Sequence, residues 1–486
     1  MGFDYKKNFI KSYFAFSAGT WVSFFLSFIQ VPTVTRIISP EEFGKSTTFQ
    51  MLLGFLFPLC LFSTHNAFIR HYYAKDENEK STLLWTSISL PLALVSVTWI
   101  FLIVLEKKVN SFVAGNSQGK VPALLGIALF LSVFQLYNET LLRLENKGKY
   151  YSLVQISKSL SNFLIIIVLT FLGLRTYETL ILATLGSVFM GLLIGLPFKA
   201  KYWLKPKFDS KEFVNIVKYS APLVFASLSY QALIFTDRFM LRLFTTFEEV
   251  GFYSASYKLV SLTTLITAGY SNFWGPYALR LYHENAENNK QIFRKMFNFV
   301  AFGMITVSIV FISAKDIVFL LLGSTYRTAA QISPFLLLYP TLIMMAFTVA
   351  RGIEFAKKTH WFIVSDFSAL IANVFGNLAL IPLFGAKGAA ISTGLSMIIV
   401  FAIEGWASNK FYPVGYDFKR AYLSISILVF VAFVNTFFNT FSGVTSGLIG
   451  LGLVVLIYKD VFSMLLRDVR KLKKYLLSRL KEMINQ

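Results

Sequence analysis

Long stretches of apolar residues, separated by short polar connections, follow one another along the whole chain. Each stretch holds about 20 residues, enough for a helix to cross a hydrocarbon core ~30 Å thick. The alternating segments of about ten residues that are typical of membrane β-strands are absent from the sequence. The pattern therefore predicts an all-α integral membrane protein. Its fourteen predicted transmembrane helices cover residues 12–37, 44–68, 82–105, 121–142, 151–173, 178–198, 218–241, 250–279, 297–322, 331–353, 361–383, 387–408, 420–440 and 444–464.

One pattern of polar residues occurs twice in the chain. The sequence Glu41-Glu42-Phe43-Gly44 opens the second predicted helix, and Glu248-Glu249-Val250-Gly251 opens the eighth, 207 residues later. A second landmark, Arg70-His71-Tyr72 with Glu77 and Lys80 after it, returns 210 residues later as Arg280-Leu281-Tyr282 with Glu287 and Lys290. Six predicted helices separate the copies, so both repeats enter the membrane in the same orientation. Two such halves are the layout of a secondary transporter, whose substrate path lies where the halves meet.

The repeat divides the chain into predicted domains. Residues 1–200 form an N-terminal six-helix bundle and residues 218–410 a C-terminal one, joined by a basic cytoplasmic linker at 201–217. Residues 411–465 add two further transmembrane helices that have no partner in the repeat. Residues 466–486, in which basic residues alternate with leucines, are predicted to form an amphipathic cytoplasmic tail at the inner leaflet.

Composition supports this assignment, and the placement of charge orients the chain. Hydrophobic residues make up 55% of the 486 residues, charged residues 15%, and the formal net charge is +21. The basic residues lie in short connections rather than in one patch, which argues against a nucleic-acid partner. Alternate connections hold 33 Lys and Arg against 10 in the opposite set. The positive-inside rule therefore places both termini in the cytoplasm.

Several chemistries are missing from the sequence. It contains no phosphate-binding glycine loop, no His/Cys cluster with metal-ligand spacing and no Ser/His/Asp arrangement. No connection exceeds about twenty residues, whereas an integral glycosyltransferase or polymerase usually carries its catalytic groups in a larger loop. Cys60 is the single cysteine, so no intrachain disulfide forms. We therefore expect no enzyme, no cofactor and no metal, and an ion gradient or substrate supply as the driving force.

Charged residues inside predicted helices are the candidate functional groups, because each costs at least ~2.5–3.5 kcal/mol to insert. Lys158 shares a helix face with Gln155 and Asn162. This face suits a substrate path, although Lys158 also lies close enough to the cytoplasmic end to snorkel. Glu139 and Arg143, four residues apart, are expected to form a local pair. Other cationic candidates for the path are Lys258, Arg36 and Arg238.

Acidic and amide residues complete the set. Asp366 corresponds in the repeat to the residue beside Lys158, so the halves are expected to turn opposite charges toward each other. It and Asp237 are the candidates for gating or ion coupling; a satisfied network for Asp366 and an ion pair of Asp237 with Lys258 are the structural alternatives. The polar residues predicted to line the cavity are Gln30, Gln155, Asn162, Asn272, Asn373 and Asn377.

Two segments resemble a known family. Thr35-Arg36-Ile37-Ile38-Ser39-Pro40-Glu41-Glu42-Phe43-Gly44 is similar to the first inter-helix signature of Wzx-type O-antigen and capsular polysaccharide flippases. Asp237-Arg238-Phe239-Met240-Leu241, followed by Glu249 to Leu259, is similar to their second-half signature. The resemblance covers the first twelve helices and points to the multidrug/oligosaccharidyl-lipid/polysaccharide exporter superfamily. It implies a V-shaped, MATE-like pair of bundles that alternate access.

The resemblance also implies a substrate and a location. It implies transfer of an undecaprenyl-diphosphate-linked oligosaccharide, an O-antigen or capsule repeat unit, from the cytoplasmic to the outer leaflet of the bacterial inner membrane. Membrane lipid, H⁺ or Na⁺, and a glycan polymerase with its chain-length machinery are the candidate partners. The alternatives are a drug/cation antiporter of the same superfamily, a peptidoglycan-precursor flippase and, from another class, a membrane glycan polymerase or transferase.

Overall fold

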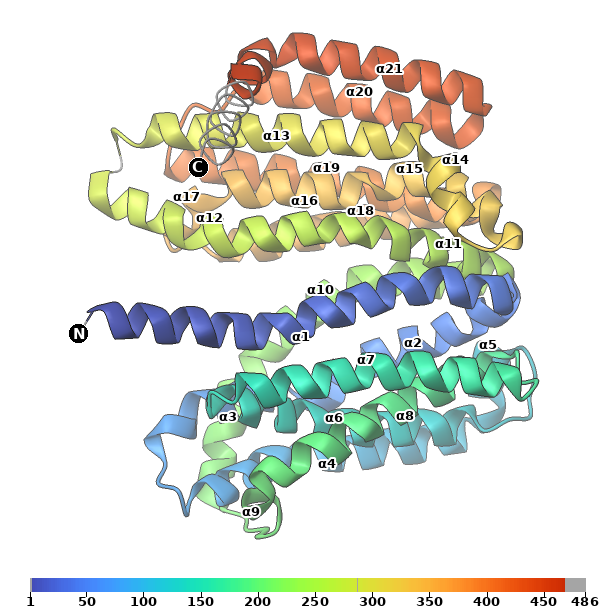
Figure 1. Cartoon of the computed structure of the whole chain (residues 1–486), viewed down its shortest axis with the longest axis vertical. Helices are drawn as coiled ribbons and strands as arrows, with labels where there is room; N and C mark the ends of the chain where they lie inside the picture. The colour runs from blue at the N-terminus through green and yellow to red at the C-terminus, as the bar shows by residue number, and fades with distance from the viewer. Residues whose placement is uncertain (1, 286, 468–486) are drawn as a thin grey trace, which may run out of the picture. The chain divides into compact units, whose positions relative to one another are not determined.

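The computed structural model describes residues 2–285 and 287–467, and every regular element in this part of the chain is helical. The first helices are α1 (Gly2–Ile37), α2 (Pro40–Leu61), α3 (Thr64–His71), α4 (Lys80–Val104), α5 (Glu106–Ala114), α6 (Val121–Leu144), α7 (Gly148–Phe171), α8 (Tyr177–Gly195), α9 (Ala200–Trp203) and α10 (Ser210–Phe244). They are followed by α11 (Phe247–Val260), α12 (Thr264–Asn285), α13 (Lys290–Ser313), α14 (Lys315–Val318), α15 (Ser333–Leu336), α16 (Leu338–Val349), α17 (Arg351–Phe355), α18 (His360–Phe384), α19 (Ala386–Phe411), α20 (Phe418–Phe437) and α21 (Thr440–Ile457). The predicted all-α class is confirmed (Figure 1).

Many of these helices have the length and composition of membrane spans. Within the described residues, nine helices meet both conditions, and two bent helix pairs raise the number to eleven. The bent pairs are Pro40–Leu61 with Thr64–Ala74, and Ser324–Gln331 with Ser333–Val349. The chain is therefore a multi-pass membrane protein, and the count of fourteen spans stays a prediction. The tail predicted at 466–486 lies almost entirely outside the described residues.

The chain forms two compact units. Unit 1 comprises the chain up to Ala255 together with Leu321–Tyr326, and unit 2 comprises Ser256–Leu320 and the chain from Arg327 onward. Helix α10 lies wholly in unit 1, whereas α11 begins in unit 1 and ends in unit 2. The predicted bundles 1–200 and 218–410 and the appended pair 411–465 stay predictions about how the chain divides.

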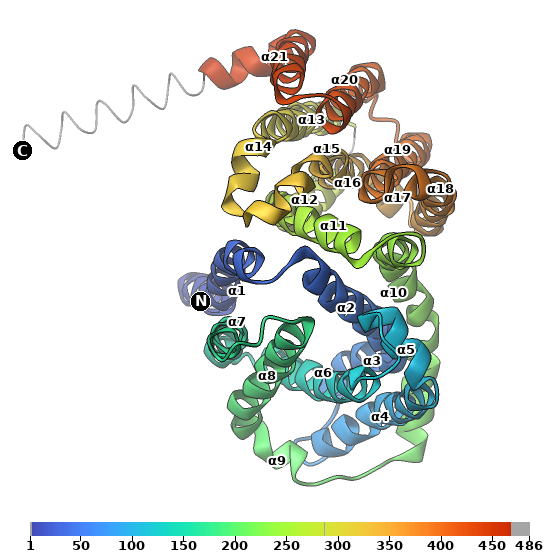
Figure 2. The same ribbon diagram turned by 90° about the vertical axis from the view of Figure 1, so that its right-hand side faces the viewer.

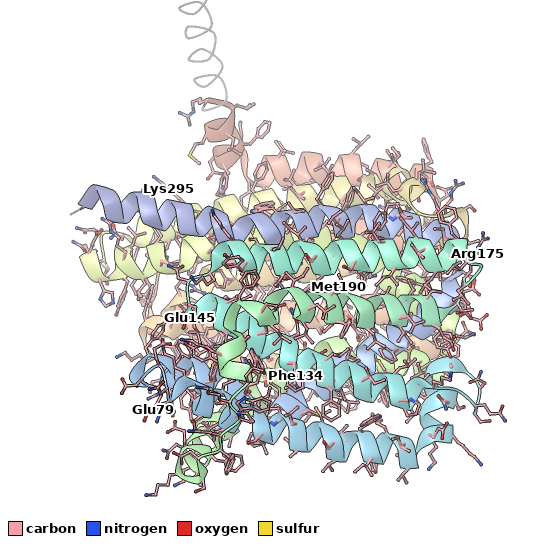
Figure 3. All side chains as sticks on the ribbon, turned by 60° about the horizontal axis from the view of Figure 1, so that its bottom comes forward. Glu79, Phe134, Glu145, Arg175, Met190 and Lys295 are labelled. Atoms are coloured by element: carbon pink, nitrogen blue, oxygen red, sulfur yellow. The ribbon has the colours of Figure 1, made fainter. Side chains whose placement is uncertain are left out.

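Helix α7 is the central element for the candidate site residues of unit 1. It packs against α1 along one side and against α8 and α6 along others (Figure 2). Buried apolar side chains fill the remainder of the unit, with Phe68 and Tyr137 fully enclosed. Glu79 and Glu145 lie at one end of these helices and Arg175 at the other (Figure 3). We call the end at Glu145 the basic end. We call the end at Arg175 the motif end, because the first Glu-Glu-x-Gly motif lies there, with Glu42 bonded to the amide of Tyr177.

Unit 2 is organised around the antiparallel pair α18 and α19. These two helices pack along their lengths, α16 covers α19, and α13 packs against α16. Helices α20 and α21 form a hairpin that lies on α13 (Figure 1). Thr440, at the start of α21, fixes this hairpin by donating its hydroxyl to Asp316 Oδ2 at 2.9 Å.

The linker between the predicted bundles is bound to unit 1 at the basic end. The Ser81 hydroxyl lies 2.8 Å from the carbonyl oxygen of Tyr202, and the Tyr202 hydroxyl donates to Glu77 at 2.7 Å. Lys201 forms an ion pair with Glu77 at 2.8 Å. Lys201, together with Lys80 and Tyr202, holds the pKa of Glu77 well below its usual range. The charged form of Glu77 therefore favours the bound linker.

We expect Glu77→Gln to release the linker from α4. Because the pKa of Glu77 is lowered in the folded state, its contribution is complete above the unfolded value near pH 4.5 and is lost as pH falls through the folded value. Tryptic cleavage after Lys201 at pH 8 should become several-fold faster, and acidification of the native protein should increase amide exchange in 199–209. Glu79→Gln, a neighbouring exposed carboxylate, is the control. Equal cleavage rates in the two variants would remove Glu77 from this role.

Candidate functional site

The charged residue at the centre of α7 is held in an ion pair. Lys158 Nζ lies 2.7 Å from Glu139 Oε1 on α6, and the two side chains are 25% and 13% exposed. Gln135 Nε2 donates to the same oxygen at 2.8 Å. The expected pair of Glu139 with Arg143 is wrong, because Arg143 donates instead to Thr140 at 3.2 Å. Pairing offsets much of the cost of placing the Lys158 and Glu139 charges among apolar helices.

Two glycines of α8 make room for this polar group. A Cβ atom on Gly191 would lie 2.7 Å from Lys158 Cγ, and a Cβ on Gly195 would lie 2.0 Å from Asn138 Nδ2. Neither glycine can be replaced without displacing a polar side chain. Asn138 is fully buried, and its amide nitrogen and oxygen have no hydrogen-bond partner among the described residues. Helices α6, α7 and α8 thus enclose a polar interior in unit 1.

Helices α1 and α7 are joined by two predicted site residues. Gln30 Nε2 donates to Asn162 Oδ1 at 2.6 Å. Asn162 is one helical turn from Lys158, so a polar strip runs along α7 with α1 on one side and α6 on another. Gln155 lies on the same strip and is half-buried. The structure thus brings Gln30, Asn162 and Lys158 together in unit 1, and their role as path lining stays a prediction.

The remaining candidates of unit 1 lie near the motif end. Asp237 is 3% exposed and accepts a hydrogen bond of 2.6 Å from the hydroxyl of the equally buried Tyr253. Arg238 follows it and is half-buried, whereas Arg36 is exposed at the end of α1. Arg36 forms no ion pair with any residue in 2–285 or 287–467. These placements leave the proposed roles of Asp237, Arg238 and Arg36 as predictions.

In unit 2 the predicted amides lie between α18 and α19. Asn373 and Asn377 are fully buried; Asn377 Nδ2 donates to Asn373 Oδ1 at 3.1 Å, and Asn373 Nδ2 donates to Thr393 at 3.2 Å. The Asn373–Thr393 bond ties the two helices together, whereas the Asn377–Asn373 bond lies within α18. Lys258 on α11, Asn272 on α12 and Asp366 on α18 are exposed within the unit. The ion pair of Asp237 with Lys258 and the facing charges of the two halves stay predictions.

Three buried charges of unit 2 were not predicted from the sequence: Lys315, Arg351 and Glu404. Glu404 on α19 is 7% exposed and accepts a hydrogen bond of 3.0 Å from the Ser365 hydroxyl. Arg351 is 3% exposed and pairs with Glu354 at 2.6 Å. Glu404 is an acid inside the predicted helix 387–408, whereas Arg351 lies at the end of the predicted helix 331–353, among the basic residues of the next connection. No group of three or more potential metal ligands occurs in the described part of the chain.

Comparison with known proteins places this chain in a family. Residues 9–281, more than half of its length, match the family described as polysaccharide biosynthesis protein. The chain belongs to the polysaccharide biosynthesis protein family. The matched region of this family member begins in α1 and ends in α12, so it contains both copies of the Glu-Glu-x-Gly motif. The resemblance that the sequence showed is thereby confirmed.

Individual relatives agree with this family assignment. The chain is 20% identical over 485 residues to the probable low-salt glycan biosynthesis flippase Agl15 of Haloferax volcanii, covering 94% of this chain and 97% of the relative. Its fold is similar to that of the lipid II flippase MurJ in an inward closed conformation, with a TM-score of 0.66, 18% identity and coverage of 93% and 99% of the two chains. It is also similar to an inward-facing MATE multidrug transporter, with a TM-score of 0.58, 16% identity and coverage of 79% and 93%. The two structural likenesses establish that this chain shares the fold of both structures.

Proposed function

We propose that this protein is a flippase that moves an undecaprenyl-diphosphate-linked oligosaccharide from the cytoplasmic to the outer leaflet by alternating access. Membership of the polysaccharide biosynthesis family and the full-length similarity to a probable glycan flippase support this proposal. The observation that carries it is the Lys158–Glu139 pair, a cation and its counter-ion kept among apolar helices. The oligosaccharide is an O-antigen or capsule repeat unit, and the bacterial inner membrane is the proposed location, with both termini cytoplasmic.

The chemistry of such a substrate matches the polar strip of α7. A diphosphate is an anion that exchanges for Glu139 as the partner of Lys158, so the lysine stays paired throughout. Amides such as Gln30 and Asn162 offer donors and acceptors to sugar hydroxyls. The polyprenyl chain remains in lipid. Lys258, Arg36 and Arg238 are further proposed contacts for the anionic group.

We also propose that an H⁺ or Na⁺ gradient drives the cycle. The described chain contains two carboxylates on facing helices of unit 2 that form no ion pair there, Asp366 on α18 and Glu404 on α19. Such groups take up a proton or a cation at a lower cost than paired carboxylates do. Together with Asp237 they are the proposed coupling and gating residues.

Reconstituted protein tests the function directly. Proteoliposomes that contain undecaprenyl-diphosphate oligosaccharide should expose it to an external lectin or glycosidase several-fold faster than protein-free liposomes do. An imposed H⁺ or Na⁺ gradient should increase that rate. Lipid II and a cationic drug, offered in parallel, separate the alternatives. Transport of the drug with no movement of either lipid would overturn the flippase proposal, and movement of lipid II alone would reassign its substrate.

A further inference from the structure

The two copies of the Glu-Glu-x-Gly motif touch each other inside unit 1. A Cβ atom on Gly44 would lie 1.8 Å from the carbonyl oxygen of Phe247, and a Cβ on Gly251 would lie 2.0 Å from that of Pro40. Pro40 and Phe247 each precede their own motif glycine by four residues. The contact is therefore reciprocal: the first turn of α2 rests on that of α11, and each glycine faces the other helix's first carbonyl (Figure 2).

The helix starts around this contact are built alike. The Ser39 hydroxyl accepts a hydrogen bond of 3.4 Å from the amide of Glu42, and the Thr246 hydroxyl accepts one of 3.4 Å from the amide of Glu249. These side chains cap the helices in the same way and fix the direction in which each first turn points. The duplicated sequence thus produces two matching surfaces, and the glycines let them approach to backbone contact.

Further contacts at the motif end join residues from different sequence repeats. The Gly323 amide donates to the Thr35 hydroxyl at 3.2 Å, and the Tyr326 hydroxyl donates to the carbonyl oxygen of Ile38 at 2.9 Å. A second contact of this kind joins α10 to α5, where Arg242 Nε donates to the carbonyl oxygen of Phe112 at 2.7 Å. The end of α1, in the first predicted repeat, is thus bound by a connection of the second predicted repeat. The end of α10, in the second predicted repeat, is bound by α5 of the first.

Physical reasons favour a contact that separates over a permanent one. A glycine brings no side chain into the contact, so parting the two backbones exposes little apolar surface. Helix α11 also leaves unit 1 at Ala255, about one turn after Gly251. The Gly323 and Tyr326 contacts are single hydrogen bonds, each worth about 0.5–1.5 kcal/mol net. Arg242 holds α5 more firmly, because its Nη2 also donates to the carbonyl oxygen of Ser111 at 3.2 Å. By contrast, Glu42 Oε2 accepts a 2.7 Å bond from the Tyr177 amide at the start of α8, well inside unit 1.

We propose that the Gly44–Gly251 contact is the closing contact of the transport path at the motif end. It is made while that end is shut, and it parts when the path opens there. That this contact controls transport rests on the proposed flippase function. That the contact opens and closes is a claim independent of that function. Any larger side chain at Gly44 or Gly251 keeps the contact open. The motif therefore acts as a duplicated gate and not as a substrate-binding sequence.

Spin labels test the motion without any substrate. With the single native cysteine, Cys60, replaced by alanine, labels at Glu41→Cys and Glu248→Cys report the distance across the contact, because both side chains are exposed. The distance between the two labels should be short in the protein that keeps Gly44 and should be longer when Gly44→Val is added. A control pair at Glu41→Cys and Glu178→Cys spans the α2–α8 contact and should stay constant. A folded Gly44→Val protein with an unchanged Glu41–Glu248 distance would overturn the proposal.

Crosslinking tests whether the contact controls transport. This test does not depend on whether the Gly44→Val protein folds. A short bifunctional crosslink between cysteines at 41 and 248 should reduce flipping at least about ten-fold, which corresponds to 1.4 kcal/mol. The 41–178 crosslink should leave flipping unchanged. Full flipping by the crosslinked 41–248 protein would exclude a gate here while leaving the flippase function intact. A mobile contact in a protein that flips no glycan lipid would instead refute the proposed function alone.

Discussion

Lys158→Ala is expected to reduce flipping at least about ten-fold and to destabilise the protein, because it leaves Glu139 charged among apolar helices with only Gln135 as a donor. Removing one partner of a buried pair costs about 3–5 kcal/mol, whereas removing both costs far less. Lys158→Ala/Glu139→Ala should therefore recover most of the stability and none of the flipping. That difference separates a lysine that holds the helices from one that also meets the substrate.

Two measurements on the same purified variants decide the matter. Denaturant unfolding reports stability, and the reconstituted flipping assay reports transport. Lys149→Ala is a matched control, because Lys149 is an exposed cation on the same helix and should change neither quantity. If the double variant flips at the rate of the unchanged protein, Lys158 has a structural role only. If it remains as unstable as Lys158→Ala, the ion pair is not the source of the destabilisation.

Tyr253→Phe is expected to lower the stability of unit 1 by about 1.5–3 kcal/mol. The Tyr253 hydroxyl donates to Asp237 at 2.6 Å, and both residues are almost fully buried. A hydrogen bond to a charged group contributes about 1.5–3 kcal/mol, and phenylalanine has no hydroxyl to donate it. Denaturant unfolding of the purified variant measures this change.

The control for this prediction is a tyrosine whose ring is exposed. Tyr73 is 74% exposed and donates to the carbonyl oxygen of Leu144 at 2.8 Å, so Tyr73→Phe should cost less than about 1 kcal/mol. Equal losses in the two variants would contradict the special importance of the Asp237 bond. Asp237→Asn then tests gating: a neutral amide keeps an acceptor for Tyr253, so normal stability with lost flipping would support a gating role.

The predicted site divides into residues whose partners the sequence could indicate and residues whose partners it could not. The spacing of Gln155, Lys158 and Asn162 placed them on one face of a helix, and the structure shows Asn162 bonded to Gln30. The partner of Lys158 was not evident, because Glu139 has a nearer basic neighbour four residues away in Arg143. Choosing between them requires the rotation of α6 against α7, which local spacing does not contain.

The linker shows the same limit. Its four lysines are typical of a solvated basic loop, and composition contains no sign that Tyr202 is enclosed. That burial depends on Ser81 and Glu77, more than a hundred residues earlier, which together bind the linker main chain and the Tyr202 hydroxyl. Glu404 is a different case, because a carboxyl inside an apolar stretch is a signal that the sequence itself contains.

The amino-acid sequence by itself determined the all-α membrane class, the recurrence of the Glu-Glu-x-Gly motif and the family, because hydropathy, motif spacing and local signatures are properties of the chain in one dimension. Only the tertiary structure decided that Lys158 pairs with Glu139, that Asn373 ties α18 to α19 through Thr393, and that the two motif glycines face each other. Each of these facts depends on how helices distant in sequence rotate and cross, which is set by the packing of many side chains at once.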